Sequence, residues 1–241
     1  AAGVVEASAL AIVEVSAERR DVLTSMFPGV AIVPTVPACD SAVIAVKPPD
    51  VPAAARDAVA AGVRRILSIA AGVTLRTIET ACGGGVAVIR SMPNTPALVR
   101  QGASAIAAGA SASDDDMQWA EHVLGSVGLV VRVPEAQLDA VTGLAGSGPA
   151  YLFLVAESLI DAGIAAGLPA DIVDPLVRQL LVGSAALLAH GESPADLRVK
   201  VTSPGGTTAA GLRVLGERDL HQAFVDAVAA ATARSRELGA S

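Results

Sequence analysis

The chain contains few aromatic residues for its length. Of its 241 residues one is Trp, one is Tyr and three are Phe, so aromatic residues make up 2% of a sequence that is 52% hydrophobic. A core of this composition has to be built from Ala, Val, Leu and Ile, whose small side chains allow helices to approach closely. The length is sufficient for one or two domains with a large core.

Basic residues and cysteines are also scarce. The 17 Lys and Arg face 24 Asp and Glu, and the net charge of −7 argues against nucleic acid or an acidic membrane as a partner. We expect no membrane span and no signal peptide, because no apolar stretch of about 18 residues lacks a charge and no basic segment precedes one. Cys39 and Cys82 have neither metal-ligand nor C-x-x-C spacing. This pattern predicts reduced thiols, no metal and a cytoplasmic protein.

Short β-branched runs alternate with Ala-rich helical stretches from Leu10 to about Val133. This alternation predicts an α/β fold with a doubly wound, mostly parallel, Rossmann-like sheet. After Pro134 every segment has helical periodicity, so we expect a dinucleotide-binding domain over 1–133 and an all-helical domain over 134–241. We expect strands at 10–15, 42–46, 66–69, 87–90, 103–108 and 129–133, and helices at 17–27, 51–61, 74–82, 114–126, 135–145, 149–166, 171–190, 194–201, 207–215 and 220–238.

A dinucleotide-binding fold normally opens with a strand and a G-x-G-x-x-G turn, and this sequence shows neither. Ala1–Val5 resembles the end of a first helix and the turn into a second strand. We therefore expect about one βα unit before Ala1. The alternative is a protein that lacks the glycine loop and binds nucleotides poorly.

The most informative segment is Val-Thr-Ser-Pro-Gly-Gly-Thr-Thr-Ala-Ala-Gly-Leu at 201–212. Its adjacent glycines allow a tight turn, and a helix that begins there presents unpaired N–H donors to a small anion such as a carboxylate. The hydroxyls of Ser203, Thr207 and Thr208 add hydrogen-bonding groups. The alternative is an ordinary glycine turn with a Thr N-cap.

Together with four other segments, this string resembles the signature of the pyrroline-5-carboxylate reductases. The four are Ala-Val-Lys-Pro at 45–48, Ser-Ile-Ala-Ala-Gly-Val at 68–73, Arg-Ser-Met-Pro-Asn-Thr-Pro at 90–96 and Gly-Ser-Gly-Pro-Ala-Tyr at 146–151. The resemblance runs from about Leu10 to Leu238. It implies reduction of 1-pyrroline-5-carboxylate to L-proline by NAD(P)H, the last step of proline biosynthesis. It also implies an intertwined homodimer, which in some members assembles further, as in a decamer of dimers.

The resemblance also assigns substrate-binding residues. It implies that Ser203, Gly206 and Thr207 hold the substrate carboxylate while Gly205 shapes the turn. Thr208 is the expected catalytic residue, with its hydroxyl facing the ring nitrogen. At the position of Lys200 relatives often have an uncharged polar residue, and its charge would lie near the carboxylate.

At the adenosine end of the cofactor, Glu14 ends a predicted strand and is followed by Val15 and Ser16. An acid there accepts hydrogen bonds from ribose hydroxyls and repels a 2′-phosphate, which favours NADH, although the family often uses NADPH. Arg19 and Arg20 follow on a predicted helix. The alternative is that Glu14 is an ordinary exposed residue.

Two further groups of cofactor-binding residues are expected at strand ends. Ala45, Val46, Lys47 and Pro48 follow one strand, and Ala70, Ala71 and Gly72 follow the next. Small residues at the carboxyl edge of a parallel sheet let the nicotinamide half lie against the backbone. Asn94 either bonds the nicotinamide carboxamide or the substrate, or holds the turn before Thr95-Pro96.

The predicted helices 149–166 and 171–188 are apolar around most of their circumference, which favours a large dimer interface. Two alternatives stay open. A different imine or β-hydroxyacid reductase would carry a catalytic Lys on a helix after the linker, and the only lysines of this sequence are Lys47 and Lys200. A non-catalytic dimer would bind proline-like ligands without a nucleotide.

Overall fold

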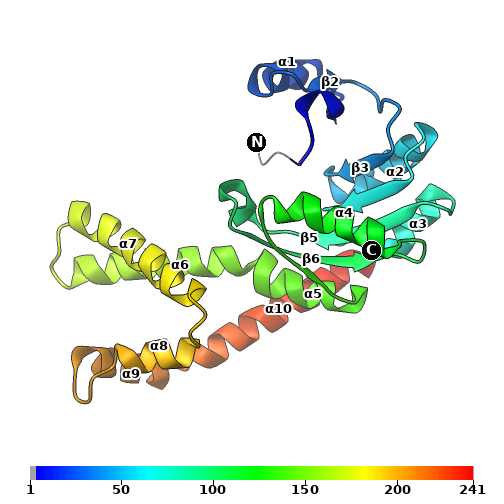
Figure 1. Cartoon of the computed structure of the whole chain (residues 1–241). Coiled ribbons are helices and arrows are strands. Elements are labelled where there is room, and N and C mark those ends of the chain that lie inside the picture. Colours follow the sequence, from blue (N-terminus) through cyan, green and yellow to red (C-terminus); the bar gives the residue numbers. More distant parts are fainter. Residues whose placement is uncertain (1–3, 241) are drawn as a thin grey trace. The chain divides into compact units, whose positions relative to one another are not determined.

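The computed structural model describes residues 4–240 and divides into two compact units (Figure 1). One unit runs to Gly146 and takes in Ala230 onward, and the other is Ser147–Ala229. This division differs from the boundary expected at 133–135. Leu138 is fully buried in the core of the sheet, and the Ser235 hydroxyl donates to Asp139 Oδ1 at 2.7 Å. Both ends of the expected helical domain are therefore held by the sheet unit.

The described strands form two sheets. In the first, β1 (Ala11–Val13) pairs in parallel with β2 (Ala31–Val33). The second has the order β3-β4-β5-β6-β7, parallel throughout except between β5 and β6. The nine residues between β5 and β6 are too few for a parallel crossover, which needs about a dozen. The strands of the second sheet are β3 (Ser41–Ile44), β4 (Arg65–Ser68), β5 (Ala87–Met92), β6 (Gly102–Ala108) and β7 (Gly128–Arg132).

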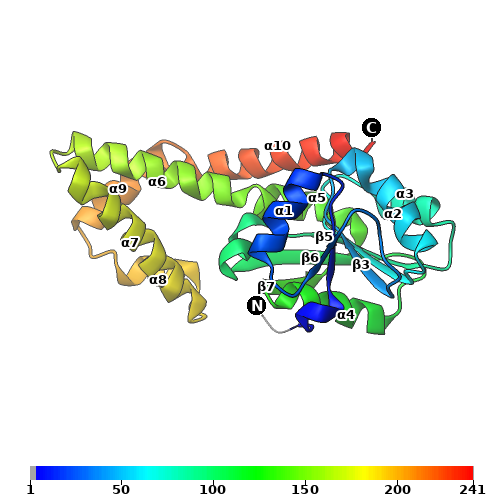
Figure 2. The ribbon, with the colours of Figure 1, turned by 90° about the horizontal axis from the view of Figure 1, so that it is seen from above.

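Helices cover both faces of the five-stranded sheet, which confirms the predicted α/β class. On one face lie α2 (Val51–Ala60), α3 (Leu75–Cys82) and the short α5 (Leu138–Val141), and on the other lies α4 (Asp114–Gly125) (Figure 1). The helices α2, α3 and α4 each bury residues three or four positions apart, as in Val51, Ala55 and Ala58 of α2. Four further elements lie before residue 100. They are η1 (Ala7–Ala9), η2 (Pro48–Asp50), η3 (Thr95–Val99) and α1 (Ala17–Met26), the helix that follows β1 (Figure 2).

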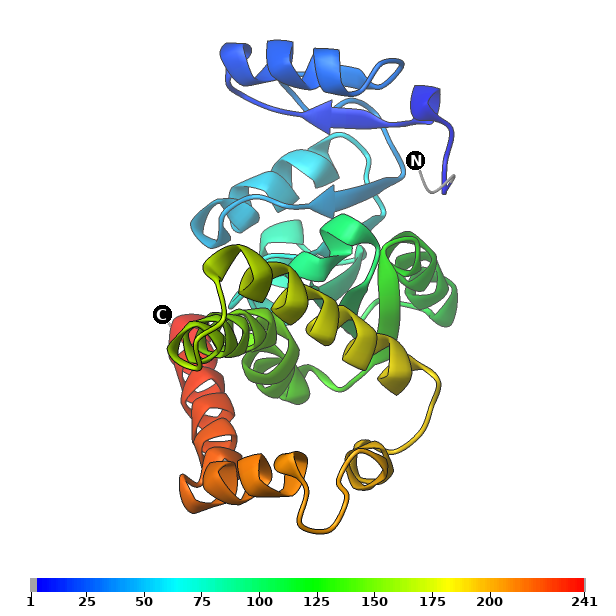
Figure 3. The ribbon, with the colours of Figure 1, turned by 90° about the vertical axis from the view of Figure 1, so that its left-hand side faces the viewer.

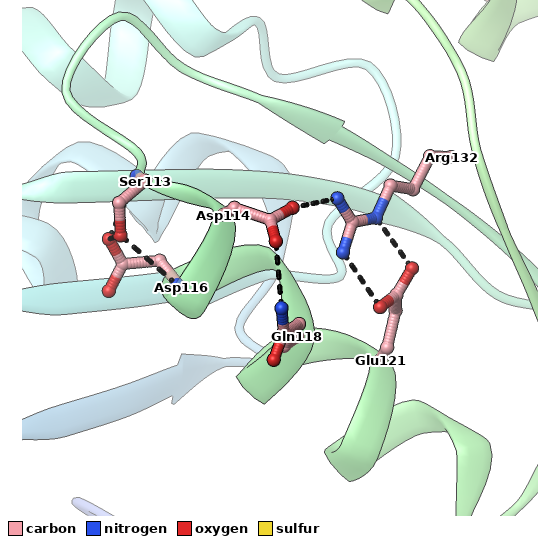
Figure 4. Close-up of polar contacts among 6 residues, drawn as sticks. All are labelled: Ser113, Asp114, Asp116, Gln118, Glu121 and Arg132. Carbon is pink, nitrogen blue, oxygen red and sulfur yellow. Dashed lines mark hydrogen bonds and ion pairs between the residues drawn. The ribbon is translucent and has the colours of Figure 1, made fainter.

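An ion network joins α4 to β7 at the surface (Figure 4). The Arg132 guanidinium donates to both carboxylate oxygens of Glu121, at 2.6 and 2.9 Å, and also contacts Asp114. These hydrogen bonds hold the pKa values of the Asp114 and Glu121 carboxyls below their usual range. At the start of the helix, Ser113 and Asp116 form a capping box. The acidic run at 114–116 thus stabilises the helix start.

In place of the one helix expected at 135–145, the chain forms three short elements: η4 (Glu135–Gln137), α5 and the π-helix η5 (Thr142–Gly146). Gly143 and Gly146 weaken a regular helix here, because glycine has a low helix propensity. The helices expected beyond this point are present as α6 (Gly148–Ala165), α7 (Ala170–Ala189), α8 (Pro194–Lys200), α9 (Thr207–Glu217) and α10 (Leu220–Ala240).

Within the helical unit, α6 and α7 form an antiparallel hairpin (Figure 1). Gly163 allows the two helices to pack closely, because a Cβ at this position would lie only 2.8 Å from Val173 Cγ1. Much of the apolar surface of both helices is exposed in the single chain. The stretches Glu135–Ala165 and Ala170–Ala189 are long and apolar enough to cross a membrane, by length and composition only. An apolar face of this extent needs either lipid or another protein surface to cover it.

Candidate active site

The loop between α8 and α9 forms a tight turn (Figure 3). Gly205 adopts φ +73°, which glycine tolerates without a steric penalty, and the Gly206 N–H donates to the Ser203 carbonyl at 3.0 Å. An added Cβ at Gly206 would overlap the Ser203 hydroxyl oxygen. The absence of a side chain at this position therefore leaves room for the Ser203 hydroxyl beside the helix start.

The first turn of α9 has unpaired donors. Thr207 and Thr208 are its first two residues, and over the described residues no side chain caps the turn, because the N-cap is Gly206. The first N–H groups of a helix have no acceptor within it and lie at the positive end of its dipole. Thr207 is exposed and Thr208 is half-buried. The structure thus places the expected carboxylate-binding residues together, around a helix end that suits an anion.

Lys200 is engaged elsewhere. Its ammonium pairs with the Glu192 carboxylate, and both side chains are largely exposed. A substrate carboxylate would have to compete with Glu192 for this charge, so the expected contribution of Lys200 to binding is reduced.

The carboxyl ends of β3 and β4 lie side by side. Ile44 is in register with Ser68, and the Ile69 N–H continues the ladder by donating to the Ile44 carbonyl at 3.1 Å. The next residues form the two loops that the sequence assigned to the cofactor. The residues that follow β3 are exposed: Ala45, Val46, Lys47 and Pro48. Those that follow β4 are the buried Ala70, the exposed Ala71 and Gly72, whose φ is +77°.

Glu14 follows β1 and lies at a turn ordered by three hydrogen bonds. Its carboxylate accepts from the Ser16 N–H at 2.8 Å, and Arg20 Nη1 donates to the Glu14 and Val15 carbonyls at 2.9 Å each. The Ser16 hydroxyl caps α1 by accepting from the Arg19 N–H. Arg20 therefore holds the turn in place. From the sequence, Arg20 was placed only on the helix predicted after Glu14, and this contact with the turn was missed.

The Asn94 side chain makes hydrogen bonds to the backbone of the protein with both of its amide atoms. Its Oδ1 accepts from the Ala103 N–H at 2.8 Å and its Nδ2 donates to the Ala145 carbonyl at 3.1 Å. This arrangement favours the turn-holding alternative for Asn94. Contact of its remaining amide N–H with a ligand stays a prediction.

An ion pair between the buried Arg90 and the half-buried Glu135, near the β4 loop, was missed from the sequence. Arg90 is almost fully buried, and its Nη1 donates to Glu135 Oε1 at 3.0 Å. The same oxygen accepts from the Leu75 N–H at 2.7 Å, at the start of α3. The pair thus fixes the helix start three residues after Gly72. Its partners are 45 residues apart in the sequence, so no local pattern could have revealed it.

Metal and thiol chemistry have little support. Within the described residues no group of three or more His, Cys, Asp or Glu is placed to hold a metal ion. Cys39 and Cys82 are free, and burial, together with the neighbouring Asp40 and Glu79, raises the pKa values of their thiols. A raised pKa makes a thiol a poorer nucleophile at neutral pH.

Comparison with known proteins decides the family. A pyrroline-5-carboxylate reductase from Mycobacterium leprae is 39% identical over 221 residues, which cover 81% of this chain and 75% of the relative. This chain belongs to the pyrroline-5-carboxylate reductase family. Residues 135–238 also match the family model described as pyrroline-5-carboxylate reductase dimerisation. A pyrroline-5-carboxylate reductase from Synechocystis is 47% identical over 175 residues, 72% of this chain and 65% of the relative.

Solved structures agree with this membership. A pyrroline-5-carboxylate reductase from Coxiella burnetii superposes with a TM-score of 0.88 at 33% identity, covering 95% of this chain and 87% of that one. A pyrroline carboxylate reductase from Plasmodium falciparum, solved with NADP bound, gives 0.83 at 27% identity, covering 99% and 90%. Several of the curated alignments, including that with the Synechocystis protein, span slightly less than two thirds of the relative's length.

Proposed function

We propose that the protein reduces 1-pyrroline-5-carboxylate to L-proline with hydride from NAD(P)H, as a cytoplasmic homodimer in proline biosynthesis. The observation that carries the proposal is the start of α9, where uncapped N–H groups and the residues Ser203, Thr207 and Thr208 surround one turn. Membership of the reductase family supports the same reaction. The Mycobacterium and Synechocystis relatives are named as pyrroline-5-carboxylate reductases, and the site at α9 suits that reaction.

The substrate has two groups that the α9 turn fits. Its carboxylate takes the N–H donors of the first turn together with the Ser203 and Thr207 hydroxyls, which fixes the imine relative to the helix. The Thr208 hydroxyl then faces the ring nitrogen. As a hydride adds to the imine carbon, the nitrogen gains a proton and becomes the amine of proline. A hydrogen bond from Thr208 that strengthens during this change lowers the barrier.

The residues at the strand ends fit a nicotinamide cofactor. The loops after β3 and β4 lie side by side at the carboxyl edge of the sheet, where such cofactors bind in α/β folds. Ala45 and Ala71 are exposed and have small side chains, which suits the approach of a flat ring to their backbone. The cofactor supplies the hydride, and the loops hold it and exclude water from one side.

The test is turnover by the purified chain. Loss of nicotinamide absorbance and formation of L-proline are measured with 1-pyrroline-5-carboxylate and either cofactor. Thr208→Val keeps the side-chain shape and should lower kcat by roughly 100-fold. Thr202→Val is the matched control, because the Thr202 hydroxyl already donates to the Arg198 carbonyl at 2.6 Å. Proline binding without turnover in the unsubstituted chain would instead support the non-catalytic alternative.

For the cofactor we propose that the protein uses NADH at least as efficiently as NADPH. The carboxylate of Glu14 already occupies the Ser16 N–H, which a 2′-phosphate would need, and Arg20 is tied to two carbonyls. Dissociation constants for both cofactors measure the preference without turnover. Glu14→Gln should tighten NADPH binding relative to NADH, whereas Glu18→Gln, on the exposed first turn of α1, should leave the ratio unchanged. A strong NADPH preference in the parent chain would contradict this assignment.

The homodimer is proposed from the helical segment. The family model for dimerisation covers 135–238, and the exposed apolar faces of α6 and α7 need a partner surface. Coverage by a second chain accounts for these faces without a membrane. Sedimentation should show no folded monomer at ordinary concentrations, and the same experiment measures whether dimers assemble into a decamer of dimers.

A further inference from the structure

The short helix η3 presents two apolar side chains to water. Leu98 is 90% exposed and Val99 is 71% exposed, and among the large apolar residues of the described chain none is more exposed than Leu98. Both lie outside the segment 135–238 that matches the dimerisation model. An exposed Leu-Val pair at the tip of a turn costs hydration free energy unless something covers it.

This tip is held in a fixed conformation. The Arg100 and Gln101 N–H groups donate to the carbonyls of Ala97 and Pro96, both at 3.0 Å. Arg100 adopts φ +59°, an uncommon conformation for a residue with a side chain, and closes the turn. The turn also lies close to β6, since a Cβ at Gly102 would be 3.0 Å from Ala97. Leu98 and Val99 therefore project from a rigid frame.

The same frame is attached to the dimerisation segment. Asn94, the N-cap of η3, donates from Nδ2 to the carbonyl of Ala145 in η5. Met92 packs on Gly146, where a Cβ would lie 2.6 Å from Met92 Cε. Leu144, the residue before Ala145, is 65% exposed and belongs to the matched segment. The η3 tip is thus fastened to a part of the chain that carries the dimerisation signature.

We propose that Leu98 and Val99 are buried by a second copy of this chain, against the apolar α6–α7 hairpin of the partner subunit. The inference rests on the proposed homodimer and extends its interface to the sheet unit. The hairpin exposes residues of matching chemistry, among them Leu152 and Phe153. A rigid apolar tip that enters such a surface removes its apolar area from water with little loss of conformational freedom. Because Asn94 is the N-cap of η3, contact of η3 with the partner subunit would also hold Asn94, an expected cofactor-binding residue, in place.

The first test measures dimer dissociation. In a Leu98→Asn/Val99→Asn variant the dissociation constant should rise by roughly 100-fold or more, since a symmetric dimer loses each contact twice. Circular dichroism should show an unchanged fold, because both side chains are exposed in the single chain. Met26→Asn is the matched control, with a 62% exposed apolar residue on α1, and should dissociate like the parent. An unchanged dissociation constant in the double variant, or a monomeric parent chain, overturns the inference.

The second test identifies the occupant. A photo-crosslinking amino acid placed at position 98 should give an adduct of twice the chain mass, with cross-linked peptides from α6 or α7. Cross-links only within one chain, or none, overturn the inference. Both tests are made without substrate, so they are independent of the proposed reaction. A chain that cross-links as expected but does not turn over would refute the function and leave the interface standing.

Discussion

Substitution of Gly206 by Ala separates binding of the substrate carboxylate from folding. The added methyl would overlap the Ser203 hydroxyl oxygen, and the next nearest atom, the Ser203 carbonyl oxygen, would lie at 3.2 Å. A hydroxyl can rotate away at low cost, whereas the carbonyl has to shift by only a few tenths of an ångström. The backbone of Gly206 has φ −78°, which Ala adopts without strain. The fold should therefore persist while Ser203 leaves the carboxylate site.

The size of the effect follows from these two consequences. A hydrogen bond to a charged group contributes about 1.5–3 kcal/mol, so its loss should raise the KM for 1-pyrroline-5-carboxylate by roughly 10- to 100-fold. For stability, Ala is a poorer N-cap than Gly, but it also restricts the unfolded chain, so the unfolding free energy should change by less than about 1 kcal/mol.

Steady-state kinetics and thermal unfolding of four proteins decide the matter: the parent, Ser203→Ala, Gly206→Ala and the double variant. If Gly206→Ala acts by displacing the hydroxyl, the double variant should have the same KM as Ser203→Ala. Gly205→Ala is the control, because φ +73° makes it strained although no described atom lies within 4 Å of the added Cβ. It should lower stability by about 1 kcal/mol. Additive effects in the double variant, or an unchanged KM in Gly206→Ala, would refute the reasoning.

Three further substitutions test the framework. Gly128→Ala should prevent or severely weaken folding, because its φ is +153° and the added Cβ would overlap the backbone of the neighbouring strand; expression and thermal melting measure this. Arg132→Met should lower the melting temperature more at pH 7 than at acid pH, since the hydrogen bonds from Arg132 depress the pKa of Glu121 and that stabilisation is lost as pH falls through the folded-state pKa. High salt should shrink the same difference. Arg90→Met should cost about 2 kcal/mol or more in denaturant unfolding, because Glu135 loses its buried partner; a smaller loss would mean that water replaces Arg90.

Local patterns predicted most of the elements, because the residues that carry each pattern are neighbours along the chain. In α2 the spacing of Val51, Ala55 and Ala58 reports the buried face directly, and the apolar runs of β4 and β5 report strands buried on both sides. The three-residue strand β2 was missed. The predicted helix over 135–145 was wrong in form: Gly143, which has a low helix propensity, lies buried within a π-helix there.

The order of residues along the chain was enough to predict the α/β class, because short β-branched runs alternate with Ala-rich stretches, and the family, because its motifs are short and occur in order. Anion binding at the turn over 203–208 stays a prediction. Tertiary structure alone decided which polar groups remain available to a ligand. Arg20 is occupied by backbone carbonyls, Asn94 joins β6 to η5, and Lys200 pairs with Glu192. It also decided that the last helix returns to the sheet unit through Ser235 and Asp139. These contacts join residues up to 96 positions apart, and such pairings depend on packing that no local periodicity encodes.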